Sequence, residues 1–202
     1  MRTIIVANSP IKSFYKIYKN QPNDYLIGVD GGAISIIDRN LQLDLAIGDF
    51  DSTNQLELIK QKALKILVYP IEKNETDLEL AIMNSPTNDI YIYDNIGGRL
   101  DHEILSVNLL YKYQDKNITI LNETNKIVYL KKGKYNIAME HYNHFSFIIP
   151  NKAIVSTNNT LYNLNNQQLS NMDTYCTSNN ILDKNKDIEI EVHQGGIILI
   201  LS

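Results

Sequence analysis

Short apolar runs alternate with longer amphipathic stretches over the first part of the chain. Runs of β-branched and aromatic residues favour strands, and apolar residues spaced three or four apart favour helices. The runs predict strands at Thr3–Ala7, Tyr25–Val29, Leu45–Ile47, Ile66–Val68, Ile90–Tyr93 and Ile118–Leu121. The stretches between them predict helices at Ile11–Tyr18, Ala33–Arg39, Gln55–Lys62, Leu78–Met83 and Leu100–Tyr113. This alternation predicts a parallel sheet covered on both faces. The clearest helical repeat is in the last helix, where Leu100, Ile104, Val107 and Leu110 predict an apolar face.

The pattern changes near Asn122, beyond which no convincing helix follows. Gly, Asn and Pro separate short strand candidates at Lys126–Leu130, Tyr135–Ala138, Phe145–Ile149, Ala153–Thr157, Ile188–Val192 and Ile197–Leu201. Asn158–Ser170 is rich in Asn and Gln and is interpreted as a loop. The chain is therefore predicted to have an α/β domain with a parallel sheet at 1–122 and a smaller all-β domain, an antiparallel sandwich or barrel, at 123–202.

Composition narrows the function classes without selecting one. The 202 residues carry 19 basic and 23 acidic side chains, a net charge of −4, which predicts no general attraction to nucleic acid or anionic membrane. No apolar run approaches the roughly 20 residues of a membrane span. The single cysteine, Cys176, cannot form an internal disulfide, which favours a reducing cytoplasm.

Acidic residues follow several of the predicted strands. Asp30 follows the second strand, Asp49 and Asp51 the third, Asp77 the fourth and Asp101 the fifth. The carboxyl ends of parallel strands share one edge, where ligands usually bind. Two carboxylates about 5 Å apart repel by roughly 3 kcal/mol at an effective dielectric of about 20, so a cluster favours a cation, and Mg²⁺ prefers such oxygens. The structural alternative is that each aspartate only caps a helix or shapes a turn.

Asp49 and Asp51 have the sharpest local pattern. In an extended segment, residues two apart point the same way, so both carboxylates would face one ion while Phe50 packs on the opposite side. The alternative is a turn in which one of the two caps the following helix.

Glycines suggest where phosphate would lie. The amides of Gly31 and Gly32 open a helix and would meet an anion, and Gly97-Gly98 repeats this arrangement and adds the guanidinium of Arg99. No Walker A loop and no GxGxxG are present, so the usual nucleotide fingerprints are missing. His102, in the first turn of the longest helix, either touches nucleotide or merely packs.

Four motifs together resemble thiamine pyrophosphokinases. They are Asp30-Gly31-Gly32-Ala33, Gly48-Asp49-Phe50-Asp51-Ser52, Lys73-Asn74-Glu75-Thr76-Asp77 and Gly97-Gly98-Arg99-Leu100-Asp101-His102, and Thr177–Asn180 resembles a late segment of the same family. The resemblance implies an α/β domain followed by a β-sandwich, a homodimer, and transfer of pyrophosphate from ATP to the hydroxyl of thiamine.

The resemblance also implies roles for residues. Those expected to organise Mg²⁺ are Asp30, Asp49, Asp51 and Asp77. Those expected to hold the nucleotide are Thr76, Arg99 and Asp101. Ser178 and Asn179 are expected near thiamine, where the subunits meet. Asp49, Asp51 and Arg99 are the expected catalytic residues, and no general base is named, because either aspartate acts as one only if it is not committed to metal.

The family pattern is altered mainly on the thiamine side. The departures are Asn74, Ser106, Asn180 and the shortened run Thr160–Leu164. Two other functions therefore stay open. One is a pyrophosphokinase acting on another alcohol, such as a pterin, and the other is a module that senses nucleotide or thiamine diphosphate without turnover.

Overall fold

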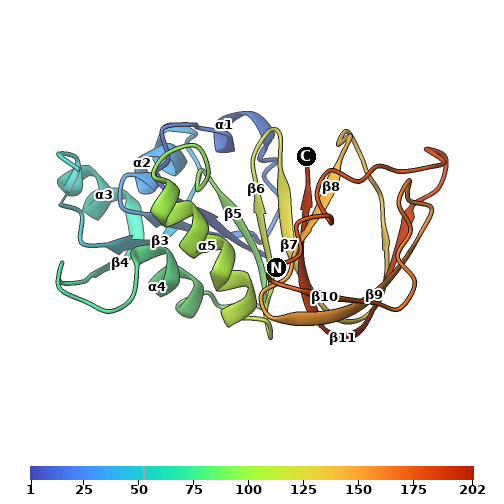
Figure 1. Cartoon of the computed structure of the whole chain (residues 1–202). Coiled ribbons are helices and arrows are strands. Elements are labelled where there is room, and N and C mark those ends of the chain that lie inside the picture. Colours follow the sequence, from blue (N-terminus) through green and yellow to red (C-terminus); the bar gives the residue numbers. More distant parts are fainter. Residues whose placement is uncertain (52) are drawn as a thin grey trace. The chain divides into compact units, whose positions relative to one another are not determined.

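The computed structural model describes residues 1–51 and 53–202, which form two units (Figure 1). The first unit contains Met1–Leu109 and Asp115–Glu123, and the second contains Leu110–Gln114 and Thr124–Ser202. From the sequence we expected a single boundary after residue 122. In the structure, Leu110–Gln114 at the end of the longest helix belong instead to the β-rich unit.

The first unit is built on a parallel sheet. Its strands are β1 (Thr3–Val6), β2 (Tyr25–Val29), β3 (Leu43–Gly48), β4 (Ala63–Val68), β5 (Asp89–Tyr93) and β6 (Asn117–Leu121). They lie in the order β6-β5-β1-β2-β3-β4, and every pairing among these strands is parallel. The order reverses at β1, between β5 and β2. All the strands expected from the sequence of this unit are present, which confirms the α/β class.

Helices cover both faces of this sheet. They are α1 (Phe14–Ile17), α2 (Gly32–Asp38), α3 (Leu56–Lys62), α4 (Asp77–Met83) and α5 (Leu100–Lys112). Alternate strand residues such as Ile4 and Val6 pack with Phe14 and Ile36 of α1 and α2. Ile5, between them, is also fully buried, as expected for strands covered on two sides. In Figure 1, α4 and α5 lie in front of the sheet.

Two helix predictions were inaccurate in detail. The helix expected at Ile11–Tyr18 is only the single turn α1, whose first amide donates to Oδ1 of Asp94 at 2.8 Å. In α5, Leu100 and Ile104 are 68% and 54% exposed, whereas Ser106 and Leu109 are buried. The apolar spacing identified the helix correctly but placed its buried face wrongly over the first two turns.

The second unit consists mainly of antiparallel strands. They are β7 (Lys126–Ile137), β8 (Phe145–Ile148), β9 (Lys152–Asn158), β10 (Gln167–Ser170) and β11 (Ile188–Leu201). The long strand β11 pairs with β7 along one side, and on the other side with β9 near its start and β8 near its end; β10 pairs with β9. Alternate residues of these strands, including Val155, Ile190 and Leu199, form one buried core.

The strand predictions for this unit missed two features. Lys126–Leu130 and Tyr135–Ala138 are parts of the continuous strand β7, and Ile188–Val192 and Ile197–Leu201 are parts of β11. The polar residues between the apolar runs lie in strand because backbone pairing with the neighbouring strand continues through them. The last four residues of the expected loop Asn158–Ser170 form β10, in which only Leu169 is buried, so the strand has little apolar signal.

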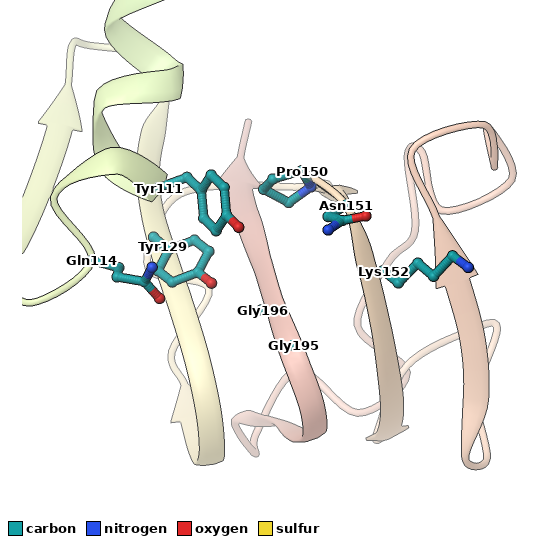
Figure 2. Close-up of a pocket in the computed structure, with 8 residues that line it drawn as sticks. All are labelled: Tyr111, Gln114, Tyr129, Pro150, Asn151, Lys152, Gly195 and Gly196. Atoms are coloured by element: carbon teal, nitrogen blue, oxygen red, sulfur yellow. The ribbon is translucent and has the colours of Figure 1, made fainter.

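A small pocket of about 180 Å³ lies in the second unit, beside a register shift in β11 (Figure 2). Tyr111 and Tyr129 line one side, and Lys152 points away from them. A Cβ atom on Gly196 would lie 1.9 Å from the hydroxyl of Tyr129, so glycine here makes room for the ring. Among the described residues, no helix is both long and apolar enough to cross a membrane.

Candidate active site

Asp30 is held in a strained turn directly after β2. Its φ of +47° lies in the left-handed region, which non-glycine residues rarely adopt. Its amide donates to the carbonyl of Ile47 at 3.0 Å, and its Oδ1 accepts the amide of Phe50 at 3.1 Å. The carboxylate of Asp30 is thereby turned towards the end of the neighbouring strand β3. Backbone strain of this kind is common at functional sites.

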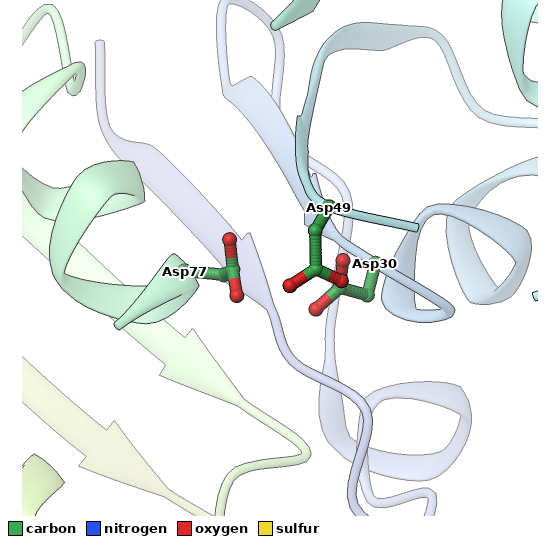
Figure 3. A group of neighbouring side chains, drawn as sticks. All are labelled: Asp30, Asp49 and Asp77. Carbon is green, nitrogen blue, oxygen red and sulfur yellow. The ribbon is translucent and has the colours of Figure 1, made fainter. Parts of the chain in front are cut away.

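Asp30, Asp49 and Asp77 form a group of carboxylates at the carboxyl edge of the sheet (Figure 3). Asp49 follows β3, and Asp77 is the first residue of α4. Each offers one oxygen, and these three oxygens all lie within 4.8 Å of one another. Three carboxylates far apart in the sequence thus lie close together. The sequence had predicted that these three would gather at this edge of the sheet.

Lys73 lies among these carboxylates and was given no role by the sequence reasoning. Its Nζ lies 3.1 Å from Oδ2 of Asp49 and 3.2 Å from Oδ1 of Asp77. It also donates to the carbonyl of Pro70 at 3.1 Å. One signal for Lys73 was present in the sequence, because it lies four residues before Asp77 in the same motif. Lys73 precedes α4, however, so this spacing is not a helical one.

The carboxylates of this group differ in acidity. Burial, together with the nearby charges of Asp77 and Asp49, raises the pKa of Asp30 to about 6. Burial also opposes ionisation of Asp49, but hydrogen bonds from the Asp51 amide and the Lys73 ammonium outweigh it and hold the pKa of Asp49 below its usual range. Asp30 is therefore a weaker acid than Asp49.

The donor set fits a hard divalent cation. Oxygens that share one Mg²⁺ at 2.0–2.1 Å lie about 3–4 Å apart, so the three carboxylates need only a small adjustment to share an ion. The ammonium of Lys73, bound by two of them, is direct evidence that this place favours positive charge.

Asp51 lies outside this group. Asp51 is exposed, and its amide donates to Oδ1 of Asp49 at 3.2 Å. The assumption of an extended segment was wrong, since β3 ends at Gly48 and Phe50 has a φ of +56°. Phe50 is nevertheless buried in the core, as expected. The metal and catalytic roles of Asp51 stay predictions.

The glycines and threonine expected to bind nucleotide have clear structural roles. A Cβ on Gly32 would lie 2.0 Å from the carbonyl of Val6, and one on Gly31 would lie 2.6 Å from the side chain of Asn8. Both glycines thus allow α2 to pack closely on the end of β1. Thr76 caps α4, since its Oγ1 accepts the amide of Glu79 at 3.2 Å. Contacts of these residues with nucleotide stay predictions.

The second glycine pair binds an internal anion. Oε1 of Glu103 accepts the amides of Gly97 and Gly98 at 2.9 and 2.6 Å. These are the amides expected to meet phosphate, so a carboxylate of the chain occupies that position. Arg99 pairs instead with Asp101, with 2.6 Å between Nη2 and Oδ2, and its side chain is 73% exposed. His102 is exposed as well.

Ser178 and Asn179 lie in the second unit. Ser178 has a φ of +57° and is exposed. The side chain of Asn179 is only 9% exposed; its Oδ1 accepts the amides of Tyr162 and Asn180, and its Nδ2 donates to the carbonyl of Tyr162. The polar groups of Asn179 that were expected to contact thiamine thus form hydrogen bonds that connect two loops of the protein.

Fold and site together define a two-unit protein, with a cluster of three carboxylates in an α/β unit and a separate antiparallel β unit. Models of two known domains match the chain: the catalytic domain of thiamin pyrophosphokinase matches residues 17–122, and its vitamin B1 binding domain matches residues 134–197. A thiamine pyrophosphokinase of Bacillus subtilis is 34% identical over 166 residues, covering 77% of this chain and 78% of the relative. The chain belongs to the thiamine pyrophosphokinase family.

Solved structures agree with this assignment. The crystal structure of thiamine pyrophosphokinase from Bacillus subtilis has a TM-score of 0.87 and 28% identity, covering 100% of this chain and 99% of that one. A thiamin pyrophosphokinase family protein from Enterococcus faecalis has a TM-score of 0.86 and 25% identity over 100% and 99% of the two chains. The yeast enzyme, at 16% identity and a TM-score of 0.77 over 99% of this chain and 85% of its own, supports the fold alone.

Proposed function

We propose that this chain transfers a pyrophosphoryl group from ATP to the hydroxyl of thiamine, yielding thiamine diphosphate and AMP, with Mg²⁺ held by Asp30, Asp49 and Asp77. The observation that carries the proposal is the convergence of these three carboxylates within 4.8 Å at the edge of a parallel sheet, in a chain of this family. Ligands of open parallel sheets bind at this edge.

The residues of the first unit have separable tasks in this proposal. The three carboxylates hold the metal, which supplies charge neutralisation for the triphosphate. Arg99, exposed and able to leave Asp101, makes a bidentate contact with a phosphate group. Asp51, one residue beyond Phe50, is available to orient the thiamine hydroxyl or to accept its proton. Positioning and electrostatics supply most of the rate enhancement in phosphoryl transfer.

The second unit is proposed to bind the acceptor. The match of residues 134–197 to a vitamin B1 binding domain supports this. Ser178 is the better candidate for a direct contact, because the side chain of Asn179 is already engaged with Tyr162 and Asn180. We further propose a homodimer and a cytoplasmic location, the latter supported by the single buried cysteine Cys176.

The test is AMP formation by the purified chain with ATP, Mg²⁺ and thiamine, compared with other alcohols including a pterin. Asp49→Asn and Asp77→Asn should each lower the rate at least about a hundredfold, as expected for loss of a contact to developing charge. Asp115→Asn, an exposed carboxylate in the same unit, is the matched control and should have the wild-type rate. AMP formation that does not depend on thiamine, or full activity of both site variants, would contradict the proposal.

A further inference from the structure

Lys73 has the contacts of a bound cation. Its Nζ donates to Oδ2 of Asp49 and to the carbonyl of Pro70, both at 3.1 Å, and it forms an ion pair with Oδ1 of Asp77 at 3.2 Å. The side chain is only 10% exposed. Lys73 is thus held inside the protein by two hydrogen bonds and by ion pairs with two carboxylates, which distinguishes it from a lysine that extends into solvent.

The same two carboxylates belong to the group that is proposed to hold the metal. Asp49 and Asp77 cannot give these oxygens fully to a divalent ion while they bind the ammonium, because two cations about 3–4 Å apart repel strongly in a partly buried site. Without Lys73, however, the three carboxylates would repel one another more strongly, because the ammonium that pairs with two of them would be gone.

We propose that Lys73 is a tethered counter-ion that competes with the divalent metal for Asp49 and Asp77 and moves to the nucleotide phosphates when metal and nucleotide bind together. This inference rests on the proposed function. Lys73 is a positioning residue in this scheme, since it acts on the metal through the two carboxylates.

The competition links the two ligands. A divalent ion arriving alone must displace an ammonium that then has no anionic partner. When the divalent ion binds together with a triphosphate, the displaced ammonium has a new anionic partner, because the phosphate oxygens accept its hydrogen bonds. Lys73 thus weakens binding of free metal and strengthens the mutual dependence of metal and nucleotide, which is a coupling free energy between two sites.

The test measures Mn²⁺ binding by electron paramagnetic resonance or calorimetry, without thiamine and without turnover. Lys73→Met keeps the length of the side chain and removes its charge. In the absence of nucleotide, this variant should bind Mn²⁺ on the order of tenfold more tightly than wild type. Addition of a non-hydrolysable ATP analogue should increase the Mn²⁺ affinity of the variant less than it increases that of wild type. Metal-free Lys73→Met should also unfold at a lower temperature, and saturating Mg²⁺ should remove most of that difference.

Lys60→Met is the matched control, since Lys60 is an exposed lysine of the same unit and pairs with the exposed Glu57. It should change neither Mn²⁺ affinity nor its dependence on nucleotide. If Lys73→Met does not fold, Lys73→Gln carries the same comparison. Equal or weaker Mn²⁺ binding by the folded variant would overturn the inference while leaving the metal site in place. No Mn²⁺ binding by wild type, with or without nucleotide, would overturn the metal site and this inference together.

Discussion

The absence of a side chain at Gly48 makes room for the carboxylate of Asp30. A Cβ atom at position 48 would lie 1.9 Å from Oδ1 of Asp30, well inside van der Waals contact. Gly48 also has a φ of +151°, which L side chains rarely adopt. The last residue of β3 is therefore glycine so that the carboxylate following β2 can reach across to the amide of Phe50.

Replacing this glycine should damage both the fold and the site. Gly48→Ala forces Asp30 away and strains the backbone, so we expect a loss of about 2–4 kcal/mol in the free energy of unfolding, measured by urea titration, together with much weaker Mn²⁺ binding. Gly133→Ala is the control, because its Cβ would meet only the flexible end of Tyr135 at 3.2 Å. A Gly48→Ala protein with wild-type metal affinity would show that Asp30 does not need its observed position.

The carboxylate of Glu103 accepts hydrogen bonds from the amides of Gly97 and Gly98, which were expected to bind phosphate. Removal of this carboxylate should leave both amides available to phosphate. We expect Glu103→Ala to bind an ATP analogue about fivefold more tightly, equivalent to about 1 kcal/mol, because a competing carboxylate is gone. The same change should lower the free energy of unfolding by about 1–2 kcal/mol, since two amides lose their partner. Calorimetric titration and urea unfolding measure the two effects. Glu57→Ala, an exposed glutamate in the same unit, is the control. Unchanged or weaker nucleotide binding would mean that phosphate does not use these amides.

The pair of Arg2 and Asp24 should make stability depend on pH in the acid range. Burial opposes ionisation of Asp24, but hydrogen bonds from Arg2 and Tyr18 outweigh it and hold the pKa of Asp24 below its usual range. The folded protein thus binds this proton less readily than the unfolded chain. The stabilisation is fully present above about pH 4, the ordinary aspartate pKa, and is lost as pH falls through the depressed value.

The variant Asp24→Asn tests this linkage. At pH 7 it should unfold with about 2 kcal/mol less free energy than wild type, because a hydrogen-bonded charge pair is lost. The difference should shrink as the pH falls through the depressed pKa of Asp24, because the wild-type carboxyl then becomes protonated. Urea unfolding at a series of pH values measures it, with Asp115→Asn as the control. A deficit that is equal at both ends of the range would refute the pH argument.

Asn179 should be important for the stability of the second unit irrespective of thiamine. Its buried amide makes three hydrogen bonds, two to Tyr162 and one to the amide of Asn180. We expect Asn179→Ala to cost about 2–3 kcal/mol in the free energy of unfolding, because buried backbone groups lose their partners. Asn158→Ala, at an exposed residue whose side chain donates to Glu189, should cost less than about 1 kcal/mol. If both variants are equally stable, Asn179 has no such structural role.

Apolar runs and the residues after them were enough to predict the strands of the first unit and the edge where Asp30, Asp49 and Asp77 meet. This worked because strands buried on both faces are apolar throughout, and parallel strands present their following loops at one edge. The second unit was harder. Its strands β7 and β11 continue through polar residues, and β10 buries a single leucine, so their extent depends on backbone pairing with partners distant in sequence.

The sequence by itself determined the order of strands and helices in the first unit, the family, and the set of carboxylates from which the site is built. Only the tertiary structure decided which side chains meet. The left-handed turn at Phe50 leaves Asp51 outside the group, Lys73 lies between Asp49 and Asp77, and Glu103 caps the glycine amides. Periodicity indicates which positions of a strand or helix share a face, because side-chain direction follows the local repeat. The direction of a polar side chain in a loop instead depends on backbone angles and charges supplied by segments far away in the chain, and no local pattern records those.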